Sequence, residues 1–213
     1  MVATPPLDES NLAGMGDTEK AAYLQNLGSQ LMNEGKYNEA VSNYQTAAKL
    51  NPEDEDVHYN LGLAYSKQGN RDGAKHEYLE ALRIYPDYPE ARNNLGNLLL
   101  TEGNVEGALT NFKAAIEVTA DDPLLHNNLG HAFARQGKYD EAIASFREAL
   151  RLKPDYLEAR YNLGMAYLQQ KQTEQASEVF TEILRTNPDF GPARQALAKA
   201  RHLQSPQTNN PAP

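Results

Sequence analysis

A single recurring interval limits what this chain can fold into more than any other feature of its sequence. The tripeptide Asn-Leu-Gly occurs five times, always 34 residues apart, beginning at Asn26, Asn60, Asn94, Asn128 and Asn162. An alanine follows each glycine by twelve positions, and four positions later stands an aromatic residue: Tyr44, Tyr78, Phe112, Phe146 or Phe180. A fixed period of about 20 to 50 residues is typical of proteins built from stacked copies of one small unit. We therefore expect a row of repeated units.

Each unit contains two stretches with helical spacing. In the second unit, Val57, Leu61 and Tyr65 recur four residues apart and form one apolar stripe. A second stripe that includes Tyr78 follows after Gly69, a residue type that commonly ends helices. Proline disfavours helical dihedrals in the residue before it, so the in-phase prolines end the second stretch: Pro52, Pro86, Pro154 and Pro188. The pattern predicts a helix–turn–helix hairpin in each unit and an all-α chain.

The glycine of each tripeptide indicates a close approach of two helices. Glycine inside a helix costs about 1 kcal/mol relative to alanine, so its recurrence at one position needs a steric reason. We expect the aromatic residues, such as Tyr44, to fill the seam to the neighbouring hairpin. Lys171 replaces the turn glycine in the fifth unit, which predicts a less favourable turn there.

The 34-residue spacing of Leu-Gly, alanine, an aromatic residue and proline resembles the tetratricopeptide repeat, or TPR. The resemblance implies an all-α TPR solenoid, a right-handed superhelix of helix–turn–helix hairpins whose first helices line a concave groove. We expect five repeats at 21–54, 55–88, 89–122, 123–156 and 157–190. A capping helix is expected at 191–204, with a mostly disordered N-terminal tail at 1–20 and a disordered tail at 205–213.

Composition and charge exclude several classes of function. The 213 residues carry a formal net charge of −9, which argues against a partner that is a nucleic acid or an anionic membrane. There is no cysteine, so disulfides and cysteine-ligated metals are excluded. The longest aliphatic run is three leucines, and the N-terminus lacks the features of a secretory signal. We expect a cytoplasmic protein.

No arrangement of residues predicts catalysis or a cofactor. His126 and His131 are five residues apart, whereas two ligands on one helix face are three or four apart. His58 and His126 occupy the same repeat position, which favours a packing role. Sequence signatures of hydrolases, phosphate loops and zinc proteases are missing from the chain. We expect no metal, no cofactor and no enzymatic activity.

The asparagine row is the strongest functional feature. An asparagine amide donates and accepts hydrogen bonds, so it can pair with a peptide bond whatever side chains the peptide carries. The row resembles the asparagine ladder in the TPR region of O-linked N-acetylglucosamine transferase. The alternative is that these asparagines bond only the neighbouring hairpin or water. The candidate peptide-binding groove consists of Asn26, Asn60, Asn94, Asn128, Asn162, Tyr59, Leu63, Asn97, His131, Tyr161 and Met165, with Lys67 and Arg135 at its rim.

These observations favour a non-catalytic scaffold or adaptor that binds a peptide segment or a partner protein in its groove. One alternative is the substrate-recruiting arm of a glycosyltransferase whose catalytic domain is absent from this chain. A second alternative is a structural assembly factor that self-associates through its end repeats. We expect a monomer or a weak homo-oligomer.

Overall fold

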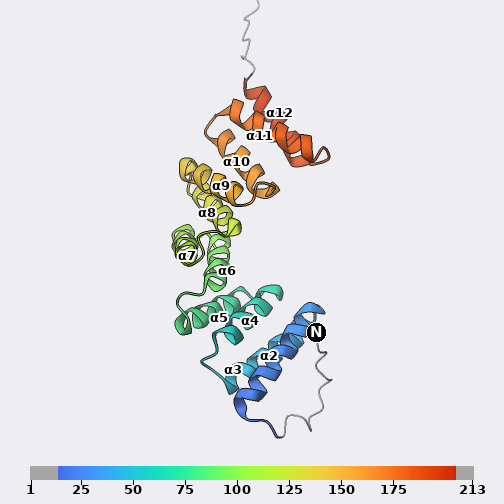
Figure 1. Ribbon diagram of the computed structural model, residues 1–213, viewed down its shortest axis with the longest axis vertical. Helices are drawn as coiled ribbons and strands as arrows, with labels where there is room; N and C mark the ends of the chain where they lie inside the picture. Colours follow the sequence, from blue (N-terminus) through green and yellow to red (C-terminus); the bar gives the residue numbers. More distant parts are fainter. Residues whose placement is uncertain (1–13, 205–213) are drawn as a thin grey trace, which may run out of the picture. The chain divides into compact units, whose positions relative to one another are not determined.

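The computed structural model describes residues 14–204, which form helices joined by short turns, with no strand among them (Figure 1). The all-α prediction is therefore confirmed. The helices are α2 (Asp17–Asn33), α3 (Tyr37–Leu50), α4 (Glu55–Lys67), α5 (Arg71–Ile84), α6 (Pro89–Thr101), α7 (Val105–Val118), α8 (Pro123–Arg135), α9 (Tyr139–Leu152), α10 (Leu157–Gln169), α11 (Thr173–Thr186) and α12 (Gly191–Gln204).

The chain forms two compact units. The boundary lies between Leu98 and Leu99, inside α6. The first unit contains α2 to α5, and the second contains α7 to α12. Of the tails expected from the sequence, residues 1–13 and 205–213 lie outside the described residues. The end of the expected N-terminal tail is helical instead. Helix α2 begins at Asp17, about one turn before residue 21, where the first repeat was expected to begin.

The helix boundaries repeat with the period of the sequence. The first helices of successive hairpins, α4, α6, α8 and α10, begin at residues 55, 89, 123 and 157. The second helices, from α3 to α11, begin at residues 37, 71, 105, 139 and 173. The C-terminal α12 begins at residue 191, again 34 residues after α10. It therefore starts where the first helix of a sixth repeat would start.

Within each hairpin, the glycine of Asn-Leu-Gly lies against the aromatic ring of the second helix. A Cβ atom built on Gly62 would lie 2.7 Å from the ring of Tyr78, and one on Gly164 would lie 2.6 Å from the ring of Phe180. Both rings are buried. The close approach expected from the sequence is present, and the aromatic side chain fills the crossing inside its own hairpin. Tyr44 also lies in one buried cluster with Leu61 and Ala64 of the next hairpin, at the seam expected from the sequence.

The turn between the two helices of a repeat uses a left-handed residue. Gly35, Gly69, Gly103 and Gly137 have φ angles between +74° and +84°. Lys171 takes the same place in the fifth repeat with a φ of 62°, and it is the one non-glycine residue with positive φ in the range 14–204. The backbone of this turn therefore has the same left-handed conformation as in the other repeats, although lysine disfavours a positive φ.

The turn between repeats is tied by a second recurring contact. A side chain in the first turn of the following helix donates to the carbonyl oxygen six residues before it. These hydrogen bonds join His58 to Pro52, Arg92 to Pro86, His126 to Ala120, Arg160 to Pro154 and Arg194 to Pro188. The contact at Ala120 shows that the turn survives without its proline. The contact in α12 again places that helix in the phase of a first helix.

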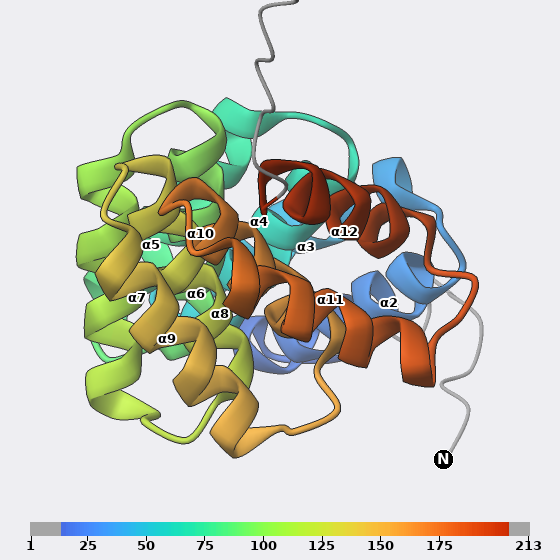
Figure 2. The ribbon, with the colours of Figure 1, turned by 90° about the horizontal axis from the view of Figure 1, so that it is seen from above.

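The last helix packs on the second unit's apolar core. Figure 2 shows α12 beside α11, and the two helices are in contact. Ala193, Leu197 and Ala200 are buried in one cluster with Phe180 and Ile183 of α11. The opposite face of α12 carries exposed polar residues, namely Arg194, Gln195, Lys199, Arg201 and Gln204.

None of the helices in residues 14–204 is both long enough and apolar enough to cross a membrane.

Candidate functional site

The five asparagines of the row lie at one position of five successive first helices, from α2 to α10. Asn26 is exposed, and the other four are half-buried. Each asparagine lies on the same helix face as the candidate residue three positions later, such as Leu63 on α4 and Met165 on α10. The helical phase therefore presents the row at a partly accessible surface, which a groove residue requires.

Two amides of the row bond the preceding repeat. Asn94 donates from Nδ2 to the hydroxyl of Tyr59 at 3.2 Å, and Asn162 donates to Oδ1 of Asn127 at 3.1 Å. In both cases the acceptor lies 35 residues earlier in the chain. An asparagine amide has two N–H groups and a carbonyl, so each bond leaves further hydrogen-bonding capacity. The contact to the neighbouring hairpin and a contact to a peptide are compatible.

Asn127, which directly precedes Asn128 of the asparagine row, is not accessible to a ligand. The structure buries it to 1% exposure, and its Nδ2 donates to Glu158 at 3.4 Å. Its role is to hold Asn162 and Glu158 of the next repeat, since a buried amide needs partners.

A pocket of about 310 Å³ lies in the second unit, between the first helices of adjacent repeats. Five of its lining residues are those that the sequence assigned to the groove: His131, Arg135, Tyr161, Asn162 and Met165. The remaining lining residues were not foreseen: Ala134, Tyr139, Phe146, Ala166 and Gln169. Tyr139 and Phe146 come from α9, a second helix. An aromatic residue at the start of a second helix, such as Tyr139, is the signal that could have identified this wall.

The electrostatics of this pocket are set by two side chains of α8. Loss of hydration lowers the pKa of His131, and the positive charge of Arg135 lowers it further, while Glu158 opposes the shift. His131 is therefore neutral near pH 7, where it both donates and accepts a hydrogen bond. Arg135 is exposed and supplies the positive charge at the pocket's edge. The pocket thus combines apolar walls with one fixed cation.

In the first unit, a hydrogen bond brings two of the candidate residues together. The bond between Asn94 and Tyr59 joins α6 to α4. Lys67 stands exposed at the last residue of α4, with no bonded partner in the part of the chain that the structure describes. Of the remaining candidates of this unit, Asn26 is exposed, and Asn60, Leu63 and Asn97 are half-buried. A place for Lys67 at the rim of a groove remains a prediction.

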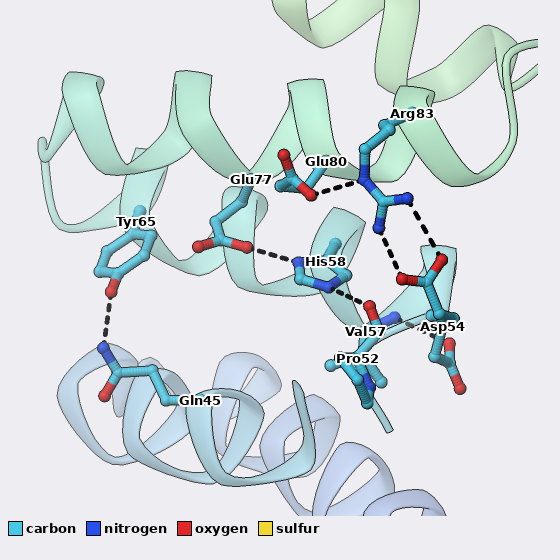
Figure 3. Close-up of polar contacts among 10 residues, drawn as sticks. Gln45, Pro52, Asp54, Val57, His58, Tyr65, Glu77, Glu80 and Arg83 are labelled. Carbon is cyan, nitrogen blue, oxygen red and sulfur yellow. Dashed lines mark hydrogen bonds and ion pairs between the residues drawn. The ribbon is translucent and has the colours of Figure 1, made fainter. Parts of the chain in front are cut away.

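His58 and His126 hold the turns between repeats in place. The Nδ1 atom of His58 lies 2.7 Å from Oε2 of Glu77. Its Nε2 atom donates a hydrogen bond to the carbonyl oxygen of Pro52 at 3.0 Å (Figure 3). The hydrogen bond to Glu77 raises the pKa of His58, although burial opposes the shift. His126 donates in the same way to Ala120. Within residues 14–204, no three histidine, aspartate or glutamate side chains are grouped so that they could hold a metal ion.

Comparison with protein-family models finds the same repeat along most of the chain. Models described as tetratricopeptide repeat match residues 55–88, 77–110 and 133–201, and a model described as TPR repeat matches 28–69 and 96–137. These matches overlap into one continuous stretch from residue 28 to residue 201. No curated protein matches the sequence.

Solved structures with the same fold cover most of the chain. One is YrrB, described as a TPR protein with an unusual peptide-binding site; it is 25% identical, with 84% of this chain and 92% of that one covered and a TM-score of 0.74. TTC0263, a thermophilic TPR protein of Thermus thermophilus, is 26% identical, with 85% and 99% covered and a TM-score of 0.63. MamA of Desulfovibrio magneticus RS-1 is 21% identical, with 81% and 97% covered and a TM-score of 0.76. At that identity the similarity to MamA concerns the fold alone.

Proposed function

Because the chain belongs to the tetratricopeptide-repeat proteins, we propose that it is a non-catalytic scaffold that binds a peptide segment of a partner protein. The segment would lie along the first helices, on the face that carries the asparagine row. The similar protein YrrB, which is described as having a peptide-binding site, supports this class of ligand.

The observation that carries the proposal is the pocket of the second unit. Its volume of about 310 Å³ is at the lower end of the range of small-ligand pockets, about 300 to 1,000 Å³. That space suits one large apolar side chain, which would contact Tyr161, Met165 and Phe146. The amide of Asn162 borders the same space, so it can bond the backbone of the residue that is anchored there. Arg135 favours an acidic group next to the anchor.

A selection from a random dodecapeptide library tests the proposal. The complete chain is immobilised, enriched peptides are synthesised, and their Kd values are measured by fluorescence anisotropy. We expect enriched peptides with leucine, methionine or phenylalanine next to aspartate or glutamate. Met165→Ala removes part of the pocket wall and should weaken binding about fivefold to thirtyfold, the range of a truncated anchor contact. Gln175→Ala, on the exposed face of α11, is the matched control and should leave Kd unchanged.

Asn162→Ala separates the two roles of the asparagine row. An amide that loses its partner in a desolvated groove costs about 1 to 3 kcal/mol, so binding should weaken about fivefold to a hundredfold. The same comparison applies to Asn60, Asn94 and Asn128. A clearly lowered unfolding midpoint with unchanged affinity would instead assign the row to the fold. Failure to enrich any peptide, or peptides whose binding is insensitive to Met165→Ala and Asn162→Ala, would reject the proposed groove.

A cytoplasmic location remains a prediction, and fractionation of cells that express the chain would test it.

A further inference from the structure

Four tyrosines of the first unit form a continuous cluster that begins in the core and ends in solvent. The ring centroid of Tyr59 lies 6.2 Å from that of Tyr78 and 4.9 Å from that of Tyr88. Tyr85 extends the cluster, with its centroid 5.9 Å from that of Tyr88. Tyr78 is 2% exposed, whereas Tyr85 is 46% exposed. An exposed tyrosine that leads to a packed aromatic cluster presents a rigid ring face to a ligand.

Two carboxylates border this cluster. Tyr88 donates from its hydroxyl to Oδ1 of Asp56 at 2.6 Å. Burial raises the pKa of Tyr88, and the bond to Asp56 and the charges of Asp56 and Glu90 raise it further. Burial likewise raises the pKa of Tyr59, and Glu90 and Asp56 add to the shift. Both carboxylates therefore act on the rings of the cluster.

Neither carboxylate has a cationic partner among the described residues. Both side chains are exposed, and within residues 14–204 neither Asp56 nor Glu90 is in an ion pair. The nearest cation in sequence, Arg92, directs its Nε to the carbonyl of Pro86. The cluster thus joins electron-rich ring faces to two uncompensated negative charges, and this combination attracts a cation.

The second repeat differs here from the corresponding part of the fifth. Tyr161 and Phe190 repeat the aromatic pair at a centroid distance of 5.6 Å. Phe190 has no hydroxyl, so no bond like that between Tyr88 and Asp56 can form there. The corresponding carboxylate, Glu158, accepts from Asn127 instead. The hydrogen bond between a tyrosine hydroxyl and a carboxylate that is seen at Tyr88 and Asp56 is therefore not repeated at the corresponding positions of the fifth repeat.

We propose that Asp56, Tyr59, Tyr85, Tyr88 and Glu90 form a second binding site, which accepts an arginine side chain of the partner's peptide segment. Arginine fits better than lysine, because a planar guanidinium stacks on tyrosine and donates two parallel hydrogen bonds to a carboxylate. The inference rests on the proposed function only in that the arginine is presented by a peptide. It concerns the first unit, whereas the apolar pocket lies in the second.

The test uses three short peptides and the complete chain. The probes are acetylated, amidated Gly-Ser-Gly-X-Gly-Ser-Gly peptides in which X is arginine, lysine or citrulline. Citrulline has nearly the shape of arginine but carries no charge. The peptides are titrated to about 20 mM, and the ring resonances of the tyrosines are followed by NMR. We expect the resonances of Tyr85 and Tyr88 to shift with the arginine peptide, less with lysine, and not with citrulline.

A second part of the test removes the negative charges of the two carboxylates while keeping the shape of their side chains. The double variant Asp56→Asn, Glu90→Gln should weaken arginine binding about twofold to thirtyfold, because each of the two exposed charge pairs contributes about 0.2 to 1 kcal/mol. The matched control Glu39→Gln, Asp72→Asn changes the net charge equally at exposed positions of the same unit and should bind as the parent does. Circular dichroism checks that each variant is folded.

Several outcomes would overturn the inference. Equal shifts with the arginine and citrulline peptides would show that the site does not recognise the charge of the guanidinium. An equal loss of affinity in the control variant would show that only the net charge of the protein matters. Failure of the arginine peptide to shift the tyrosines would also reject this site. The dodecapeptides that respond to Met165→Ala would then still support the groove of the second unit, so failure of this inference is distinguishable from failure of the proposed function.

Discussion

Lys171 adopts a backbone conformation that its four counterparts reach as glycine. Left-handed backbone costs a non-glycine residue about 1 to 2 kcal/mol, because its Cβ approaches the following carbonyl oxygen. The strained angle persists because the hydrogen bonds of the turn, such as that from the amide of Gln172 to the carbonyl of Tyr167, fix the chain on both sides. The backbone conformation at this position is thus set by the hydrogen bonds of the turn and not by the preference of the residue type.

Lys171→Gly should stabilise the second unit by about 1 kcal/mol, since the strain is removed and the Lys171 side chain has no bonded partner within residues 14–204. Urea denaturation followed by circular dichroism measures the change in midpoint. The reverse change Gly137→Lys, at the same turn of the fourth repeat, should lower the midpoint by a similar amount. An unchanged or lowered midpoint in Lys171→Gly would show that the turn is not strained.

At the scale of elements, the hairpin of α4 and α5 is joined by an ion pair inside its packing surface. The side chains of His58 and Glu77 are 11% and 12% exposed, so solvent screens their interaction weakly. The ring donates on its other side to Pro52, which ties the turn before α4 to the same group (Figure 3). Both ring nitrogens donate only when His58 is protonated. The hairpin is therefore most tightly joined when His58 is charged.

The stability contributed by this pair should depend on pH. The folded-state pKa of His58 is raised above the unfolded value of about 6.5. The contribution is therefore fully present below pH 6.5 and is lost as the pH rises through the folded-state pKa. Urea midpoints measured from pH 5.5 to pH 9 should show His58→Gln destabilised at low pH, with the difference from the parent shrinking as the pH rises. His126→Gln, whose ring has no bonded carboxylate in the described region, is the control. A difference that stays constant with pH would refute this role of His58.

At the scale of the whole molecule, every repeat needs a neighbour to cover its apolar face, and the last one is covered by α12. A solenoid's repeats contact only their neighbours, so its ends require a helix with a polar outer face. The buried alanines and Leu197 of α12, together with its exposed arginines and lysine, have this distribution. The hydrogen bond from Arg194 to the carbonyl oxygen of Pro188 anchors α12, just as the equivalent bonds anchor α4, α6, α8 and α10.

Deleting residues 191–213 should therefore lower the thermal midpoint of the second unit and promote self-association. The deletion exposes Phe180, Ile183 and Leu184, which pack in the cluster that α12 completes. Differential scanning calorimetry and light scattering measure the two effects. Deleting only residues 205–213 is the control and should change neither. A 1–190 chain as stable and as dispersed as the parent would show that α12 is not a cap.

Much of the fold was predictable because it depends on spacing within a helix. The positions of Asn26 and its counterparts fix the 34-residue period, and proline and glycine mark the turns. The period also places Met165 and Tyr161 on one face of α10, and both line the pocket. A helical period of 3.6 residues is a local property, so the chain alone carries it.

Relations between helices had to come from the tertiary structure. Sequence spacing did not indicate that Tyr139 would complete the pocket, that Asn127 would be buried, or that His58 would meet Glu77 nineteen residues later. The cluster around Tyr88 also depends on how one repeat packs on the next. Repeats with the same period can place different side chains at these junctions. The sequence by itself therefore determined the repeated helical hairpin, while packing between helices decided which side chains remain accessible to a partner, because accessibility depends on neighbours that are distant along the chain.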